Sequence, residues 1–234
     1  MSSIIKLLKI IHKSFAERDP VIPEIVSNYE EYHETTDIAS LNYIRANLIA
    51  GWIEPESSCL DVGCGEGSVL EFLSKTKKCK LHGMDISQLV IEAVRSKGFQ
   101  GIVRNVDKEG LALTKDQRYD YILFNEVLEH LKYPHKVLVE ACKHADKGVI
   151  VNLPNSGYIF WRLQLLRGYS PRQSFTHLHF WTINDFRIFL NVLNLRPLDS
   201  KTELSTRGIK GVISRRFKNL LSYQQSWLIA PKKS

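Results

Sequence analysis

The chain has 234 residues, 44% of them hydrophobic, and no apolar run approaches the 18 or more residues of a membrane-spanning helix. Its formal net charge is +7, and its four cysteines form no C-x-x-C pair and no other metal-ligand spacing. These properties argue against a membrane span, a disulfide framework and a metal site. They predict one cytoplasmic domain with reduced, buried thiols.

Residues 3–15 predict a basic amphipathic helix, because their apolar side chains lie largely along one helical face and lysines occupy the rest. The lysines break the pattern of a secretory signal. Packing on its own domain, packing in a homodimer and contact with a membrane interface all stay open for this helix. We expect a helical extension over residues 1–40 and a single domain over residues 41–234. Residues 29–33 contain two tyrosines and a histidine, and they can either fold over a ligand site or form a surface helix.

An apolar run ends in three alternating glycines at residues 60–67, which read Leu-Asp-Val-Gly-Cys-Gly-Glu-Gly. Glycines suit a tight turn from strand to helix, because without a Cβ a ligand can lie against the backbone amides. Asp85 closes the next apolar run, near the spacing at which a strand-end acid reaches ribose hydroxyls. A dinucleotide fingerprint needs glycine at 68, where this chain has Ser68. The pattern therefore predicts an adenosine cofactor, with NAD or a nucleotide sugar as the less favoured ligand and a purely structural turn as the alternative.

Apolar runs alternate with helical segments along the rest of the chain. Ser87 can cap a helix that runs through Lys97 and ends at Gly98. Residues 119–124 and 148–153 are suited to buried parallel strands. This β-α-β-α order predicts an α/β fold with a doubly wound, mostly parallel sheet and right-handed crossovers.

Residues 119–131 read Tyr-Asp-Tyr-Ile-Leu-Phe-Asn-Glu-Val-Leu-Glu-His-Leu. With the glycine turn and Asp85, this segment resembles the class I S-adenosylmethionine-dependent methyltransferases, whose motifs occur here in the family's order over about residues 40–232. The resemblance implies a seven-stranded, Rossmann-like sheet. It also implies S-adenosylmethionine as cofactor and S-adenosylhomocysteine as product.

The resemblance assigns cofactor contacts to the ends of the first two strands. It implies that Asp61 helps to hold the methionine amine and that Asp85 accepts both ribose hydroxyls. The turn between them lies against the methionine portion and the ribose. Its predicted cofactor-binding residues are Gly63, Cys64, Gly65 and Gly67. A reactive thiol at Cys64 is conceivable, but a small residue there serves packing.

Further contacts are implied beyond the second, third and fourth strands. Ile86 is expected to pack on the adenine face. Asp107 is expected to contact the adenine amino group. If the motif is aligned one residue earlier, Val106 occupies this position instead, and the further alternative is that Asp107 lies in a solvated turn. Asn125 is expected to reach the amino acid end of the cofactor, most safely through its backbone, and Glu126 lies beside it.

A hydroxyl acceptor needs a general base, and histidine is suited to that role near neutral pH. His130, His177 and His179 compete for it, and we predict His130 and His177 as the catalytic pair. The alternative for His130 is that it shapes the pocket without exchanging protons. Thr182 with Asp185 predicts a capping box at the start of the helix at 182–193, so part of this region is structural.

The insert at about residues 155–181 contains a short apolar helix and predicts a lid. Its order resembles a subgroup that includes MetW-like proteins and methyltransferases found with polysaccharide assembly enzymes. Under that interpretation Tyr158, Trp161 and Arg162 bind the acceptor, and Arg162 or Arg167 can meet a phosphate or carboxylate. The alternative is a hydrophobic helix packed on the sheet edge.

Residues 201–234 carry eight lysines or arginines against one acid, so this tail holds the whole net charge of +7. A basic tail can attract phosphate, an anionic lipid surface or an acidic partner, or it can be a solvated loop. Little aromatic interleaving accompanies it, so nucleic acid is not predicted as a partner.

The sequence predicts an O-methyltransferase, or less favourably an N-methyltransferase, for a small or carrier-linked acceptor such as a sugar, a lipid-linked glycan or a quinone-like compound. A MetW-like partner that binds the cofactor and regulates a homoserine acyltransferase is the alternative. The Glu-Val-Leu-Glu-His segment favours the enzyme, because MetW-like proteins generally lack it. A third hypothesis is a peripheral enzyme that docks on anionic lipid through residues 3–15 and the tail.

Overall fold

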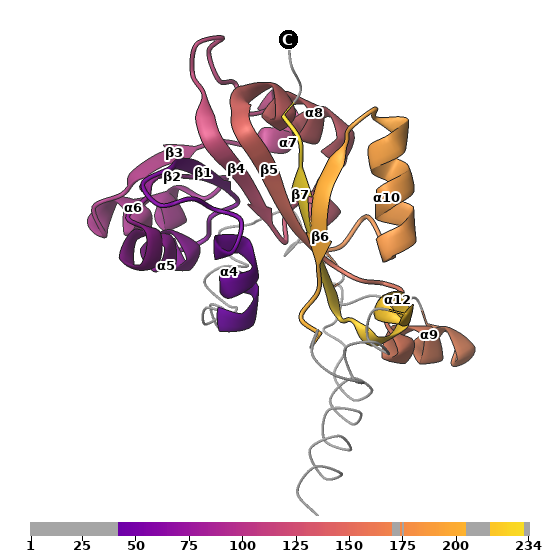
Figure 1. The fold of residues 1–234 in the computed structure, drawn as a ribbon. Coiled ribbons are helices and arrows are strands. Elements are labelled where there is room, and N and C mark those ends of the chain that lie inside the picture. The colour runs from indigo at the N-terminus through magenta and orange to yellow at the C-terminus, as the bar shows by residue number, and fades with distance from the viewer. Residues whose placement is uncertain (1–41, 170–173, 175, 205–215, 232–234) are drawn as a thin grey trace, which may run out of the picture.

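The computed structural model describes residues 42–169, 174, 176–204 and 216–231, and a single sheet organises them (Figure 1). Its strand order is β3-β2-β1-β4-β5-β7-β6. Only β7 runs antiparallel to its neighbours β5 and β6. The strands are β1 (Ser58–Val62), β2 (Lys80–Asp85), β3 (Gln100–Val103), β4 (Tyr119–Asn125), β5 (Ala145–Pro154), β6 (Pro197–Lys201) and β7 (Gln224–Ile229). The predicted doubly wound, mostly parallel seven-stranded sheet is confirmed.

Helices cover both faces of the sheet (Figure 1). Buried residues of α4, α5 and α6 form one hydrophobic cluster with β1 and β2, and those of α7, α8 and α10 form the other. The described helices are α4 (Tyr43–Ala50), α5 (Ser68–Lys77), α6 (Gln88–Ser96), α7 (Val106–Glu109), the 3-10 helix η1 (Leu128–His130), α8 (Pro134–His144), α9 (Ile159–Leu166), α10 (Ile183–Val192) and α12 (Lys218–Leu221).

Two helix starts agree with the side chains that predict them. The Ser87 side chain accepts the Val90 N–H at the start of α6. At the start of α10, Thr182 and Asp185 form a reciprocal capping box. Each cap satisfies backbone donors that a helix start otherwise leaves unpaired. The predicted helices at 87–97 and 182–193 are therefore confirmed.

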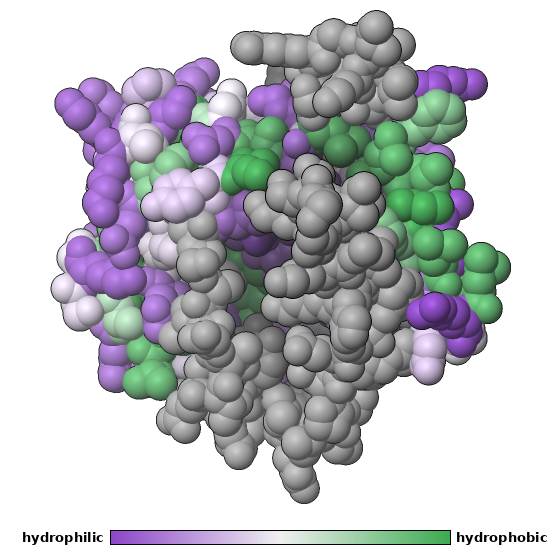
Figure 2. Space-filling view, turned by 90° about the horizontal axis from the view of Figure 1, so that it is seen from below, coloured by the Kyte–Doolittle hydropathy of each residue, from purple (hydrophilic) through white to green (hydrophobic). Residues whose placement is uncertain are grey.

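The strand order reverses between β1 and β4, so the loops after these strands diverge and leave a crevice between them. In open α/β sheets, ligands bind in such a crevice at the carboxyl ends of the strands. The lower end of the sheet in Figure 1, where β5 leads into α9, is this edge. Figure 2 looks at the molecule from that side and shows a hollow with hydrophilic and hydrophobic walls.

Several predictions lie wholly or partly outside the described residues. They are the extension at 1–40 with its helix at 3–15, the part of the lid at 170–173 and 175, and the parts of the basic tail at 205–215 and 232–234. The domain boundary at 40/41 stays a prediction. Within the described part of the chain, no helix is long and apolar enough to cross a bilayer.

Candidate functional site

The glycine turn joins β1 to α5 through three residues in the left-handed region. Gly63, Gly65 and Gly67 have φ values of 71°, 50° and 79°. The Gly63 N–H donates to the Met84 carbonyl at 2.7 Å, which anchors the turn to the end of β2. Residues other than glycine rarely adopt this left-handed backbone conformation, so the path of the turn explains the spacing of the glycines.

Alanine substitutions should separate two functions of the turn. A Cβ at Gly63 would lie 2.4 Å from Val127 Cγ2, whereas a Cβ at Gly65 meets no atom within 4 Å among the described residues. Both cost about 1 kcal/mol of backbone strain, and overpacking adds roughly 1–3 kcal/mol for Gly63→Ala. We expect Gly63→Ala to lower the melting temperature most, and Gly65→Ala to weaken S-adenosylhomocysteine binding with a smaller melting shift.

Gly98→Ala is the matched control for these two variants. Gly98 has a φ of 86° and no atom within 4 Å of its added Cβ among the described residues, but it lies at the end of α6 and does not line the cavity. It should lose stability as Gly65→Ala does and bind the ligand normally. Equal affinities for Gly65→Ala and Gly98→Ala in calorimetry would contradict a ligand lying against the turn.

Two buried carboxylates stand behind and beside the turn. Asp85 is 6% exposed, and its two oxygens accept the N–H groups of Gly65 and Ser87, each at 3.1 Å. Asp61 is 1% exposed, and its Oδ1 has no hydrogen-bond partner among the described residues. Burial, and secondly the charge of Asp85, raise the pKa of Asp61 from 3.8 to about 7. A cation brought close to Asp61 would stabilise its charged form.

A cavity of about 1020 Å³ opens at this edge of the sheet. It brings together side chains and glycines from the ends of β1, β2 and β4, as expected at a switch point. The predicted site residues that line it are Gly63, Gly65, Asp85, Ile86, Asp107 and His130. Arg104, Lys136 and Glu140 also line it, and no sequence motif indicated them.

Four predicted cofactor residues are absent from the described cavity lining. They are Asp61, Cys64, Gly67 and Asn125, none of which is among the described lining residues. Burial raises the pKa of the Cys64 thiol well above its ordinary value, which fits packing and not reactivity. Asn125 Oδ1 is buried without a hydrogen-bond partner among the described residues. Contact with a cofactor through these residues stays a prediction.

Asp107 faces the cavity but also has structural partners. Its Oδ1 accepts the N–H groups of Lys132 and Tyr133, at 2.9 and 3.1 Å. These bonds tie α7 to the loop before α8, so Asp107 helps to shape this part of the cavity wall. The alternative Val106 is 9% exposed and also lines the cavity, so both registers stay open.

Glu126 follows β4 at a φ of 59°, which is unusual for a residue other than glycine. Its carboxylate forms an ion pair with Arg45 and accepts a hydrogen bond from the Gln224 amide at 2.8 Å. Backbone strain of this kind persists where surrounding contacts hold it, and it is common at functional sites. Glu126 lines the cavity, so the strained turn and its two partners hold this residue in the cavity wall.

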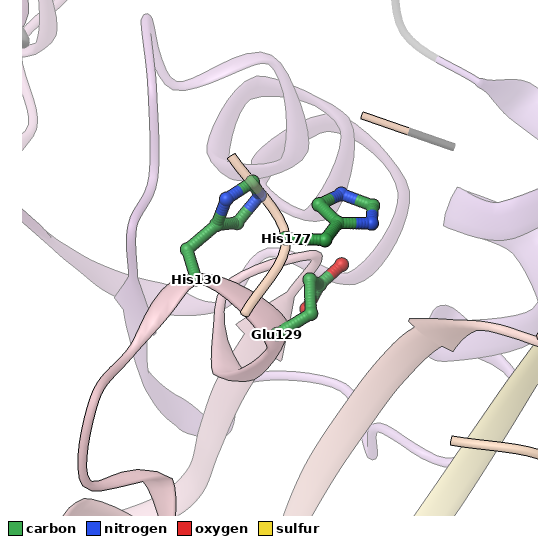
Figure 3. A group of neighbouring side chains, drawn as sticks. All are labelled: Glu129, His130 and His177. Carbon is green, nitrogen blue, oxygen red and sulfur yellow. The ribbon is translucent and has the colours of Figure 1, made fainter. Parts of the chain in front are cut away.

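The two predicted catalytic histidines lie together, with a buried glutamate beside them (Figure 3). The rings of His130 and His177 meet edge to face, with centroids 4.7 Å apart. Burial lowers the pKa of both, and that of His177 falls to about 3 with a further contribution from His130. Burial also raises the pKa of Glu129 well above its ordinary value. His179 instead stacks on Trp181 and contacts the Leu131 carbonyl at 2.9 Å.

The three predicted acceptor contacts on the lid pack elsewhere. Tyr158 and Trp161 both lie against the Tyr223 ring, with centroids 5.7 and 5.8 Å away. Arg162 Nε donates to the Gly157 carbonyl at 2.8 Å. None of the three is among the described residues that line the cavity. Their role in acceptor binding stays a prediction.

The sheet order, the glycine turn and the acid at the end of β2 together define a class I S-adenosylmethionine-dependent methyltransferase. The chain belongs to the family described as "Methionine biosynthesis protein MetW", whose model matches residues 45–229. A structure of an S-adenosylmethionine-dependent methyltransferase from Archaeoglobus fulgidus shares the fold. Its TM-score is 0.59 at 21% identity, and the match covers 88% of this chain and 100% of that one.

Two curated relatives represent different functions. "Ubiquinone biosynthesis O-methyltransferase, mitochondrial" from Candida albicans is 29% identical over 117 residues, which are 47% of this chain and 36% of the relative. "Bifunctional methionine biosynthesis protein MetXA/MetW" from Rhodopirellula baltica is 25% identical over 204 residues, which are 80% of this chain and 32% of the relative. The chain thus spans about a third of the length of each. The predicted class and its cofactor are confirmed.

Proposed function

We propose that the chain transfers the methyl group of S-adenosylmethionine to an oxygen of a small or carrier-linked acceptor, with nitrogen as the less favoured atom. The observation that supports this proposal is one cavity of about 1020 Å³ that runs from the glycine turn and Asp85 to His130. Ligand sites typically enclose about 300–1000 Å³, so this cavity is at the upper end of that range.

The reaction needs little from the protein beyond alignment and a destination for one proton. The acceptor oxygen attacks the methyl carbon from the side opposite the sulfur. The new O–C bond forms as the C–S bond breaks, and the electron pair stays on sulfur in S-adenosylhomocysteine. Holding the two reactants in line can supply much of the rate. Of the two predicted histidines, only His130 is among the described residues that line the cavity, so it is the candidate to receive the hydroxyl proton. Burial lowers the pKa of His177 to about 3, which makes that ring a poor proton acceptor.

A methyl-transfer assay tests this function. The full chain is incubated with S-adenosylmethionine labelled on the methyl group and with hydroxylated sugars, lipid-linked glycans and quinols in turn. We expect labelled product with at least one hydroxyl acceptor and none with its pre-methylated analogue. Failure of the chain to bind S-adenosylhomocysteine in calorimetry would contradict the proposal.

The second candidate is a partner protein that binds the cofactor and regulates a homoserine acyltransferase. The family match and the bifunctional Rhodopirellula baltica relative favour it. Co-purification with a homoserine acyltransferase, and a change in that enzyme's rate on adding the chain, would support this function. Turnover of the cofactor on an added acceptor without any acyltransferase would instead support the methyltransferase.

A further inference from the structure

Glu129, His130 and His177 lie close together (Figure 3), and His130 lines the cavity. One ligand atom from each residue lies within 4.8 Å of the other two. Glu129 and His130 belong to η1, whereas His177 comes from the segment before α10. The Glu129 carbonyl accepts the N–H groups of Leu178 and His179, at 2.8 and 3.2 Å. The backbone thus fixes the His177 segment against η1.

The Glu129 carboxylate lacks the partner that a buried charge requires. Glu129 is 1% exposed, and neither of its carboxylate oxygens has a hydrogen-bond partner among the described residues. An unpaired buried carboxylate costs several kcal/mol, because burial removes its hydration without replacement. Figure 3 shows this carboxylate directed towards the imidazole of His177. A cation held between them would supply the missing partner.

The His130 ring has the tautomer that a metal ligand needs. Its Nδ1 lies 3.2 Å from the Thr176 carbonyl. A carbonyl can only accept, so Nδ1 carries the hydrogen and Nε2 keeps its lone pair. Histidines that bind metals almost always donate the other ring N–H to a carbonyl or carboxylate in this way.

We propose that Glu129, His130 and His177 bind one divalent transition-metal ion, such as Zn²⁺ or Mn²⁺. One carboxylate and two imidazoles suit these ions better than Mg²⁺, which prefers oxygen ligands alone. Atoms bound to one such ion lie about 3–4 Å apart, so the three groups need to approach by roughly 1 Å, which small side-chain rotations provide. Three protein ligands leave coordination positions open.

One of the three proposed ligands, His130, lines the cavity, so the ion would lie at the cavity's edge. His130, Glu126, Thr176 and Leu178 all line the cavity next to the cluster. With the ion bound, His130 and His177 act as ligands and no longer as proton acceptors. A hydroxyl oxygen that binds the ion would then release its proton to solvent water, because a divalent cation lowers the pKa of a coordinated O–H group. This use of the ion rests on the proposed methyl transfer, whereas ion binding does not.

The experiment measures ion binding by the full chain after treatment with a chelator. Titration with Zn²⁺ and with Mn²⁺ is expected to give one bound ion per chain, and Co²⁺ to give visible absorption bands from nitrogen and oxygen ligands. Glu129→Gln keeps the shape of the side chain and should weaken binding at least tenfold, as should His177→Ala. His135→Ala removes an exposed histidine outside the cluster and should bind as the parent chain does.

Melting temperature supplies a second measurement that does not depend on activity. Zn²⁺ should raise the melting temperature of the parent chain and of His135→Ala, but not that of Glu129→Gln. S-adenosylhomocysteine binding should be unchanged in all variants, which separates this proposal from that of methyl transfer. A parent chain that binds the cofactor product but neither ion would overturn the site. Equal ion binding by the parent chain and by Glu129→Gln would overturn it as well.

Discussion

Asp85→Ala is expected to weaken S-adenosylhomocysteine binding by at least about 100-fold. Hydrogen bonds to a charged group contribute about 1.5–3 kcal/mol each, and we expect the carboxylate to accept two from the ribose. The N–H groups of Gly65 and Ser87 already hold its two oxygens in place, so the carboxylate is oriented before the ligand arrives. Calorimetric titration of the purified variant measures the change.

Two further variants separate ligand contact from support of the turn. Asp85→Asn keeps the shape and one acceptor oxygen, so we expect an affinity between those of the parent chain and Asp85→Ala. Asp116→Ala removes an exposed carboxylate outside the cavity and should change nothing. If Asp85→Asn bound the ligand as tightly as the parent chain, the role of the carboxylate would be structural. Melting curves report any loosening of the turn separately.

Local signals explain how far the sequence predicts this fold. Glycine at 63, 65 and 67 and the caps at Ser87 and Thr182 are short-range features, and each determines the structure within a few residues of itself. The acid at the end of β2 follows from the same logic, because the strand pattern positions Asp85 at the carboxyl edge of the sheet. The glycine turn, the two helix caps and the position of Asp85 could therefore be predicted without knowing how the helices pack on the sheet.

The parts that were not predicted depend on contacts between distant residues. Thr176, which orients His130, lies 46 positions beyond it, so no motif spacing could indicate the cluster with Glu129. The packing of the aromatic side chains on the lid likewise depends on residues that are distant in the sequence. Tyr158 and Trp161 lie against Tyr223, a neighbour that only the pairing of β5 with β7 brings close. Apolar composition alone could not say which side of the lid helix packs against the domain.

Asp61 should make the free protein less stable as the pH rises from about 4 to 7. In this window the unfolded chain has already lost the proton, because its pKa is near 3.8, while the folded chain keeps it up to about pH 7. The free energy of unfolding therefore falls with rising pH and levels off above 7. The gap between the two pKa values corresponds to roughly 4 kcal/mol, at about 1.4 kcal/mol per pH unit.

Asp61→Asn should remove this pH dependence, and urea unfolding at several pH values measures it. The variant is expected to be more stable than the parent chain at pH 7.5 and close to it at pH 4. Asp116→Asn is the matched control and should behave as the parent chain does.

Ligand binding should show the opposite trend, because the ammonium group of the cofactor favours an ionised Asp61. Below pH 7 the ligand must displace the proton from Asp61, so the affinity of the parent chain for S-adenosylhomocysteine should rise roughly tenfold between pH 5.5 and 7.5. Asp61→Asn should bind weakly and without this rise, in calorimetry at the same pH values. An affinity of the parent chain that did not change with pH would show that the ligand amine does not meet Asp61. Asp61 is thus expected to lower the stability of the free protein and to raise the protein's affinity for the cofactor, because the bound ammonium offsets the free-energy cost of the buried charge.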